Sequence, residues 1–202
     1  MRISVATPKA IRYACMKFHY AKAVPSVQYG FNIFNDNDEW CGVICYGGGA
    51  NNNLPKSCGM CAGEVLELVR VALNGKQGHG KTSQAVALSL RHLRKINPII
   101  KMIVSYADCD QDHVGTIYQA TNWIYLGRMN EGTKTTFIIH GKQYHPRSVN
   151  AKGWKQSVPW LKEHIDKNAT QLTSLGKRKY VFCYEKRLRK KYNKQSVPYP
   201  KK

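Results

Sequence analysis

The sequence predicts a mixed α/β fold in which helices pack on one sheet. Strand-like and helix-like patterns alternate along the chain, a hairpin signal precedes a glycine-rich turn between a strand and a helix, and no proline- or serine-rich linker divides the 202 residues. The 43% of hydrophobic residues give enough apolar mass for a core. We therefore expect a single domain over residues 1–193, followed by a basic tail over residues 194–202.

The N-terminal half predicts a helix, a hairpin and a long strand. Thr7 followed by Pro8 is typical of a helix start, because threonine caps a helix and proline fits its first position. Asparagine and aspartate between two apolar runs are typical of a hairpin turn. The expected segments are a helix from Pro8 to about Tyr20, strands at 27–34 and 40–46 with a turn at 35–38, a polar loop at 47–59 and a strand at 64–73.

The C-terminal half begins with an amphipathic helix and continues as shorter strands and helices. The first helix follows the glycine-rich turn and has an apolar stripe of Val86, Leu90, Leu93 and Ile96. Alternating aromatic and small apolar residues near the C-terminus predict a further strand. The remaining expected segments are strands at 99–106, 123–126, 135–140 and 180–184, and helices at 113–121, 159–167 and 185–192.

Positive charge dominates the composition. The chain has 32 lysines and arginines against 12 acidic residues, a formal net charge of +20. This excess favours nucleic acid as a partner, because cations that neutralise phosphates release condensed counterions, although charge alone also suits a ribosome, an anionic membrane or a solvated face. The residues expected to contact nucleic acid are Trp154, Lys177, Arg178, Lys179, Lys186, Arg187, Arg189, Lys190 and Lys191.

The cellular compartment follows from what the sequence lacks. No run reaches the roughly 18 uncharged apolar residues that a membrane span needs. The N-terminus has no apolar stretch typical of a secretory signal, and the number of cysteines, seven, is odd. We therefore expect a cytoplasmic protein with reduced thiols and no membrane partner.

Two cysteine pairs superficially resemble a zinc ribbon. Cys58 and Cys61 have the spacing of a metal-binding knuckle. Cys41 and Cys45, however, lie in an expected strand, where about 3.3 Å per residue separates them by about 13 Å, too far for one ion. Buried thiols are therefore the expectation.

The glycine-rich turn has two interpretations. Residues 75–82 match G-x-x-x-x-G-K-[ST], the phosphate-binding loop of nucleoside triphosphatases, in which glycines let backbone N–H groups converge on phosphate oxygens. Such enzymes need a largely parallel sheet and a magnesium-binding aspartate, for which Asp108 is the candidate. The alternative is the diphosphate loop of acyl-CoA-dependent transferases, Q/R-x-x-G-x-G/A, with Gly75 in place of the usual Gln or Arg.

The central part of the chain resembles a known family. Ser105-Tyr-Ala-Asp108, His113-Val-Gly-Thr-Ile-Tyr-Gln-Ala120 and Asn122-Trp-Ile-Tyr-Leu-Gly127 closely resemble the central block of the phage Mom family of DNA adenine-modification proteins. The resemblance extends to residues 19–20, 65–70, 145–148, 186–189 and 198–201. It implies a fold like that of the GCN5-related N-acetyltransferases and favours the acyl-CoA interpretation of the loop.

The resemblance also implies a function. It implies an enzyme that uses acetyl-CoA to convert the N6 amine of adenine in double-stranded phage DNA to a methylcarbamoyl-type adduct, with a requirement for iron, so that host restriction enzymes do not cut the DNA. The enzyme would act in the cytoplasm of the infected bacterium. The oligomeric state stays open, a homodimer included.

The family's functional positions carry over residue by residue. They imply catalytic or iron-binding roles for His19, Tyr20, Asp108 and Tyr118, and CoA-binding roles for Arg70, Ser83 and the loop residues Gly78, Gly80 and Lys81. Histidine, carboxylate and phenolate groups suit iron. Lys81 departs from the pattern expected in a CoA loop.

The proposed substrate sets a chemical requirement. The exocyclic amine of adenine is a poor nucleophile, and it is paired inside the duplex, so the base must be flipped out or approached from the major groove. Flipped bases stack on aromatic rings, and Trp154, between Lys152 and Lys155, is the candidate. The sequence leaves two alternatives: a nucleic-acid-stimulated triphosphatase and a non-catalytic DNA-binding protein.

Overall fold

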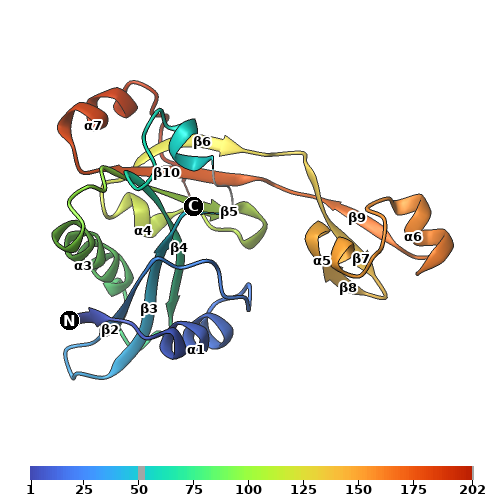
Figure 1. The fold of residues 1–202 in the computed structure, drawn as a ribbon, viewed down its shortest axis with the longest axis horizontal. Coiled ribbons are helices and arrows are strands. Elements are labelled where there is room, and N and C mark those ends of the chain that lie inside the picture. Colours follow the sequence, from blue (N-terminus) through green and yellow to red (C-terminus); the bar gives the residue numbers. More distant parts are fainter. Residues whose placement is uncertain (50–52, 202) are drawn as a thin grey trace. The chain divides into compact units, whose positions relative to one another are not determined.

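The computed structural model describes residues 1–49 and 53–201 (Figure 1). Residues 50–52 of the expected polar loop lie outside the described residues. Contacts divide the chain into two compact units. Unit 1 comprises residues 1–106, 115–127 and 179–202, and unit 2 comprises residues 107–114 and 128–178. The expected division into 1–193 and 194–202 stays a prediction.

Unit 1 contains most of a seven-stranded sheet with the order β1-β2-β3-β4-β5-β10-β6. The first four strands pair antiparallel, whereas β4 and β5 pair parallel and are connected through helix α3. This arrangement confirms the predicted mixed sheet and the hairpin at 35–38. The strands are β1 (Arg2–Val5), β2 (Tyr29–Phe34), β3 (Trp40–Gly47), β4 (Val65–Leu73), β5 (Met102–Asp108), β6 (Ile124–Met129) and β10 (Lys177–Cys183).

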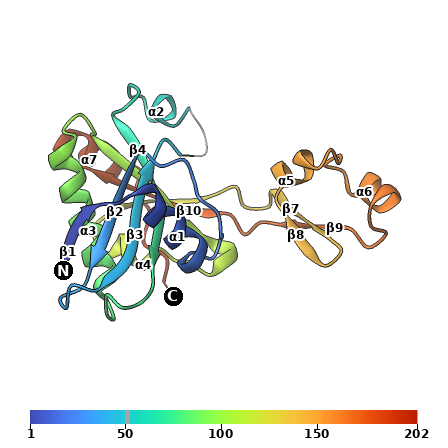
Figure 2. The same cartoon turned by 60° about the horizontal axis from the view of Figure 1, so that its bottom comes forward.

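The helices at 8–18, 81–96 and 186–193 of unit 1 lie close to where the sequence predicts them, whereas the helix at 54–57 lies in the segment expected to be a polar loop. The Thr7 side chain accepts a hydrogen bond from the backbone N–H of Ala10 at 3.2 Å and caps the first helix, as expected from Thr7-Pro8. Figure 2 shows α1 and α3 beside the strands of this sheet. The helices are α1 (Pro8–Phe18), α2 (Leu54–Ser57), α3 (Lys81–Ile96), α4 (Thr116–Gln119) and α7 (Lys186–Asn193).

Two helix predictions need correction. Val86, Leu90 and Leu93 of α3 are buried, but Ile96 is 46% exposed, because it is the last residue of the helix and lies at the edge of the core. The helix expected at 113–121 is only the single turn α4. Gly115, at a φ of +79°, begins this turn in a left-handed conformation that a continuous helix cannot contain.

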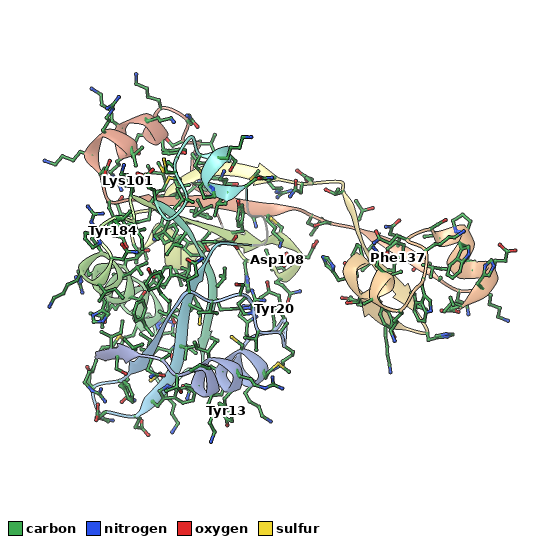
Figure 3. The ribbon with its side chains drawn as sticks, in the orientation of Figure 1. Tyr13, Tyr20, Lys101, Asp108, Phe137 and Tyr184 are labelled. Atoms are coloured by element: carbon green, nitrogen blue, oxygen red, sulfur yellow. The ribbon has the colours of Figure 1, made fainter. Side chains whose placement is uncertain are left out.

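Unit 2 has its own sheet and core. Strands β7 (Lys134–Ile139), β8 (Lys142–Tyr144) and β9 (Thr170–Thr173) form an antiparallel sheet in the order β8-β7-β9, accompanied by helices α5 (Pro146–Ala151) and α6 (Val158–His164) and the 3₁₀ turn η1 (Cys109–Gln111). The two-residue loop between β7 and β8 has positive φ at both positions, as a tight hairpin requires. Phe137, labelled in Figure 3, packs with Val149 and Leu161 in the core. The sequence analysis predicts two of these elements but not a separate core.

All seven cysteines are free thiols, and only Cys61 is exposed. Within the described residues, no helix is both long enough and apolar enough to cross a membrane.

Candidate functional site

The glycine-rich turn connects β4 to α3 and has an open, left-handed backbone. Gly75, Gly78 and Gly80 have φ values of +90°, +91° and +72°. The backbone N–H of Gly78 donates to Gly75 O, and that of Lys81 donates to Gly78 O, so two tight turns follow each other. A Cβ atom at Gly75 or Gly80 would meet nothing within 4 Å. The turn therefore leaves open space beside the N-terminus of a 16-residue helix, where an anion is stabilised.

The side chains of the turn strengthen its connection to α3. Gln77 is buried, and its Nε2 donates to Thr82 Oγ1 at 3.0 Å, while its Oε1 has no partner within the described chain. Ser83 Oγ donates to Gly80 O at 3.0 Å. A buried acceptor without a partner costs free energy unless a ligand or water reaches it. These contacts fit a preformed phosphate-binding turn.

The lysines of the turn are directed to the β2–β3 hairpin. Lys81 Nζ lies 2.6 Å from Asp36, and Lys76 Nζ lies 3.2 Å from Glu39. Hydrogen bonds from Lys81, first, and from the N-terminal amine lower the pKa of Asp36 to about 2. A triphosphatase lysine instead reaches the β- and γ-phosphates, and its sheet is largely parallel, whereas the four N-terminal strands here are antiparallel. The fold therefore disfavours the triphosphatase interpretation.

Arg70, a predicted CoA ligand, lies on β4 opposite Cys45. Its Nη1 donates to Val69 O at 2.7 Å, and its Nε is buried with no hydrogen-bond partner among the described residues. The pKa of Cys15 is lowered to about 7, first by a hydrogen bond with Cys45 and then by the positive charge of Arg70. The guanidinium thus lies near these buried thiols, and its contact with CoA stays a prediction.

The parallel pairing of β4 with β5 ends in the middle of both strands. Its last pair is Glu67 with Val104. Directly beyond it, Ser105 Oγ is hydrogen-bonded to Leu68 O at 3.1 Å and to the hydroxyl of Tyr118 at 2.8 Å. Burial raises the pKa of Tyr118 to about 12, so its phenol keeps its proton at neutral pH. The end of the strand pairing therefore carries a fixed, protonated phenol.

Glu67 is a candidate that the sequence analysis missed. It is half-buried on β4, and its negative charge contributes to the raised pKa values of Tyr106 and Tyr118, after the larger effect of burial. A side chain at Gly49 would lie 2.4 Å from its carboxylate. The available signal was a single acid inside the apolar strand Val65-Leu-Glu-Leu-Val69. A carboxylate and a protonated phenol are a suitable pair for general base and general acid catalysis.

Of the other predicted catalytic residues, His19 and Tyr20 belong to unit 1 and Asp108 belongs to unit 2. His19 ends α1, and its Nδ1 accepts a hydrogen bond from Ala21 N at 3.1 Å. The ring of Tyr20, labelled in Figure 3 and 48% exposed, stacks on His19 with centroids 4.4 Å apart. Asp108 belongs to unit 2, where its carboxylate accepts from Asp110 N at 3.1 Å. The convergence of the four residues stays a prediction.

The donor set does not fit iron in this structure. No cluster of three or more histidines, cysteines, aspartates or glutamates suited to a metal occurs in residues 1–49 and 53–201. Tyr118 is buried, protonated and bonded to Ser105, so it is a poor source of a phenolate ligand. No step of the reaction proposed below therefore uses iron.

The residues predicted to bind nucleic acid differ in their surroundings. Most of the cations on α7 are exposed, and Lys177 is also exposed. Arg178 instead donates to His113 O at 2.8 Å within unit 2, and Lys179 is half-buried. Trp154 is half-buried against the core of unit 2, with its ring 5.9 Å from that of Tyr144. Trp154 is thus partly a core residue, and Lys152 Nζ lies 5.2 Å from the centroid of its ring.

Comparisons with known proteins show which family and which fold this chain resembles. The sequence model of the Mom protein family matches residues 1–201. The methylcarbamoylase Mom of Escherichia phage Mu is 25% identical over 191 residues, which cover 91% of this chain and 76% of that protein. A chimera of the spermidine N-acetyltransferase SpeG from Vibrio cholerae matches with a TM-score of 0.53, 9% identity and coverage of 94% of this chain and 99% of that one.

A second solved structure, a phosphinothricin N-acetyltransferase by description, matches with a TM-score of 0.52, 8% identity and coverage of 92% and 99% of the two chains. At such identities the likeness concerns the fold alone. It confirms the predicted acetyltransferase-like fold.

Proposed function

Because the chain belongs to the Mom protein family, we propose that it is a DNA-modifying transferase that takes an acyl group from acetyl-CoA and acts on the N6 amine of adenine. Transfer of the acetyl group by itself forms N6-acetyladenine and releases CoA. The methylcarbamoyl-type adduct that the name of the phage Mu relative suggests contains one nitrogen more, which a second, nitrogen-containing reactant would have to supply. The enzyme would act on double-stranded DNA in the cytoplasm of an infected bacterium and would protect that DNA from restriction enzymes.

The observation that carries the proposal is the left-handed turn between β4 and α3. Three glycines with positive φ form this turn beside a helix N-terminus, and the space beside Gly75 and Gly80 is open. A diphosphate carries charge that such a turn stabilises through N–H donors and the helix dipole. When bound, acetyl-CoA supplies the activated acyl group, and the turn would hold its diphosphate.

The residues at the end of the β4–β5 pairing would accept and donate the protons of the proposed reaction. Glu67 is the proposed acceptor of the proton that the adenine amine loses as it attacks the acyl carbon. Tyr118 is the proposed donor of a proton to the leaving sulfur, because its pKa of about 12 keeps the phenol protonated until the thiolate forms. Ser105 holds the Tyr118 hydroxyl in place. Chemistry and cofactor binding thus both belong to unit 1.

The proposal is tested by label transfer. The protein is incubated with DNA and acetyl-CoA labelled with ¹³C in the acetyl group, and the nucleosides are analysed by mass spectrometry. Label in an adenine nucleoside supports the proposal. Unlabelled adenine, with label retained in the CoA pool, would refute it. The alternative, a non-catalytic DNA-binding protein, predicts tight DNA binding with no labelled nucleoside under any condition.

A further inference from the structure

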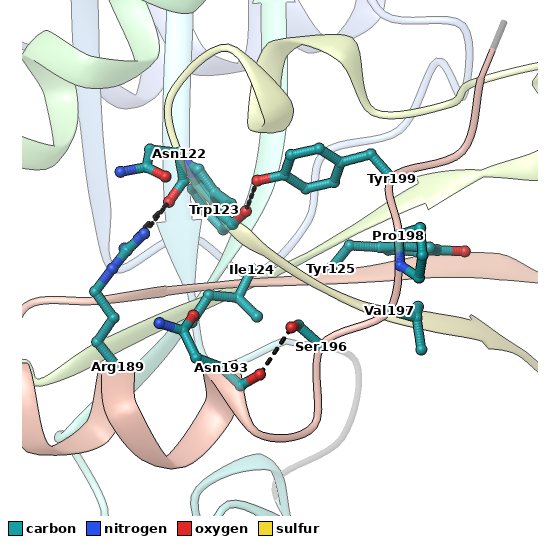
Figure 4. A pocket seen from close by; sticks show the side chains of 10 residues that line it. All are labelled: Asn122, Trp123, Ile124, Tyr125, Arg189, Asn193, Ser196, Val197, Pro198 and Tyr199. Carbon is teal, nitrogen blue, oxygen red and sulfur yellow. Dashed lines mark hydrogen bonds between the residues drawn. The ribbon is translucent and has the colours of Figure 1, made fainter.

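A pocket of about 280 Å³ lies in unit 1 between the start of β6, helix α7 and the C-terminal segment (Figure 4). Trp123 and Tyr125 lie on one side, Arg189 and Asn193 of α7 on another, and residues 196–199 close a third. No step of the proposed acyl transfer uses it. Its lining combines aromatic rings, two asparagine amides and a guanidinium.

Arg189 is held in position at this pocket. Its Nη1 and Nη2 both donate to Asn122 O at 3.1 Å. Asn122 has a φ of +62°, a left-handed conformation that is uncommon for a residue other than glycine and that clusters at functional sites. A guanidinium has five N–H donors, so an orientation fixed by two of them leaves others for an anion.

Two hydrogen bonds to backbone carbonyls hold the C-terminal segment at the edge of the pocket. Val197 N donates to Tyr125 O at 3.1 Å, and the hydroxyl of Tyr199 donates to Trp123 O (Figure 4). Tyr199 is nevertheless 43% exposed. The segment therefore brings a partly exposed aromatic ring to the pocket. Aromatic rings of this kind stack with nucleic-acid bases without strong sequence preference.

A second hollow, of about 470 Å³, adjoins the first along α7. Lys186, Arg189, Lys190, Asn193 and Lys194 line it, so Arg189 and Asn193 belong to both hollows. No carboxylate is among these residues, and the cations recur at spacings of three and four along one helix face. A phosphate group is a ligand that four cations on one helix face favour.

We propose that these two hollows bind one unpaired nucleotide of the DNA, its base in the pocket of about 280 Å³ and its phosphate in the basic hollow. The asparagine amides can pair with base edges, and the tyrosine rings can stack on a base. Trp123 directly follows the turn that carries Tyr118, and their rings lie 5.0 Å apart. The inference rests on the proposed function, since it assumes that DNA is the substrate.

The affinity experiment uses the full chain and a labelled single-stranded 12-mer, followed by fluorescence anisotropy at several salt concentrations. The triple variant K186Q/K190Q/K194Q is expected to lower the slope of log affinity against log salt by about 0.7, because the basic hollow is proposed to hold one phosphate and each phosphate contact on a single strand contributes about 0.7. Asn193→Leu is expected to weaken binding about tenfold with an unchanged slope. The matched control K9Q/K17Q/K95Q, on exposed positions of α1 and α3, is expected to change neither.

Photo-crosslinking identifies the base site directly. An oligonucleotide with 5-iododeoxyuridine is irradiated with the protein, and tryptic peptides are analysed by mass spectrometry. We expect cross-links at Tyr199, in the peptide 195–201, or at Tyr125. Cross-links confined to Trp154 and Trp160 of unit 2, or an unchanged slope in the lysine triple variant, would overturn the inference while leaving the transferase proposal intact. Tyr199 cross-links together with unlabelled adenine in the transfer assay would refute the transferase proposal alone.

Discussion

Unit 1 and unit 2 differ in the polar groups that they bury. Unit 1 buries Gln77 and Ser105, and burial raises the pKa of Tyr118. Unit 2, residues 107–114 and 128–178, contains ten lysines and arginines against six acids, and most of its described lysines are exposed. Burying titratable groups costs free energy, and such groups cluster where chemistry is performed. The comparison therefore favours unit 1 as the part of the chain that carries the proposed reaction.

The acidic side chains of unit 2 support this contrast. Asp166 accepts hydrogen bonds from His140 N at 2.6 Å and Asn168 N at 2.9 Å, which lower its pKa. Glu131 pairs with Arg128. These carboxylates stabilise loops within unit 2, whereas the charge of Glu67 in unit 1 adds, after burial, to the raised pKa values of Tyr106 and Tyr118. The same residue type thus has a structural role in one unit and a candidate catalytic role in the other.

The largest expected effect concerns Glu67. Glu67→Gln keeps the shape of the side chain but removes the proton acceptor, so we expect the rate of adenine modification to fall by about 10²- to 10⁴-fold. Initial rates from nucleoside mass spectrometry measure it, with CoA binding and thermal stability expected to stay unchanged. The matched control is Glu163→Gln, at an exposed position of unit 2. Equal rates for the two variants would remove Glu67 from the mechanism.

The next largest effect is expected in the core of unit 2, which we predict unfolds independently of unit 1. Leu161 is fully buried in the core of unit 2. Leu161→Ala is expected to destabilise that unit by about 2–5 kcal/mol. Denaturant unfolding should then show an early transition of unit 2, while calorimetric binding of CoA persists in the folded unit 1. A single transition, with CoA binding lost in parallel, would contradict the division into separate cores.

The raised pKa of Tyr118, which is 8% exposed, predicts an alkaline loss of stability. Its pKa of about 12 in the folded state exceeds the ordinary value of 10, so its contribution is fully present below pH 10 and is lost as the pH rises through about 12. For Tyr118→Phe, the fall in unfolding free energy between pH 10 and 12 should be smaller by up to about 3 kcal/mol. A variant with the same alkaline profile as the original chain would show that this phenol is not buried as described.

The smallest effect is expected at Lys81. Its ammonium is already paired with Asp36 on an exposed surface, so Lys81→Met should change CoA affinity by less than about tenfold. Calorimetry with CoA and with adenosine triphosphate measures this directly. Tight triphosphate binding that disappears in Lys81→Met would restore the triphosphatase interpretation.

The regular elements could largely be predicted from local patterns. Apolar periodicity identifies β3 and β4 within one residue and places a helix, α3, after the glycine turn, because their buried faces are set by spacing along the chain. The short α4 could not be predicted in this way, since the left-handed backbone at Asp112 and Gly115 interrupts an otherwise suitable pattern. Local patterns also do not reveal which core an apolar residue joins, so the separate core of unit 2 was missed.

The candidate site was only partly predictable. The glycine turn is visible in the sequence because its backbone requires glycine, but the letters alone also match a triphosphatase loop, and the mostly antiparallel sheet was needed to distinguish the two. Tyr118 was found through a resemblance. Glu67 became a candidate only through its neighbours Tyr106 and Tyr118, which are distant in sequence.

The most direct test of the central claim, that unit 1 holds an acyl-CoA at its glycine turn, is calorimetric titration of acetyl-CoA into two matched variants. Gly80→Ala and Gly132→Ala each place a Cβ at a φ near +75°, with nothing within 4 Å in the described structure, but only Gly80 lies in the turn. We expect Gly80→Ala to lose at least tenfold in affinity, while Gly132→Ala binds like the original chain. Equal affinities in the two variants would contradict the account.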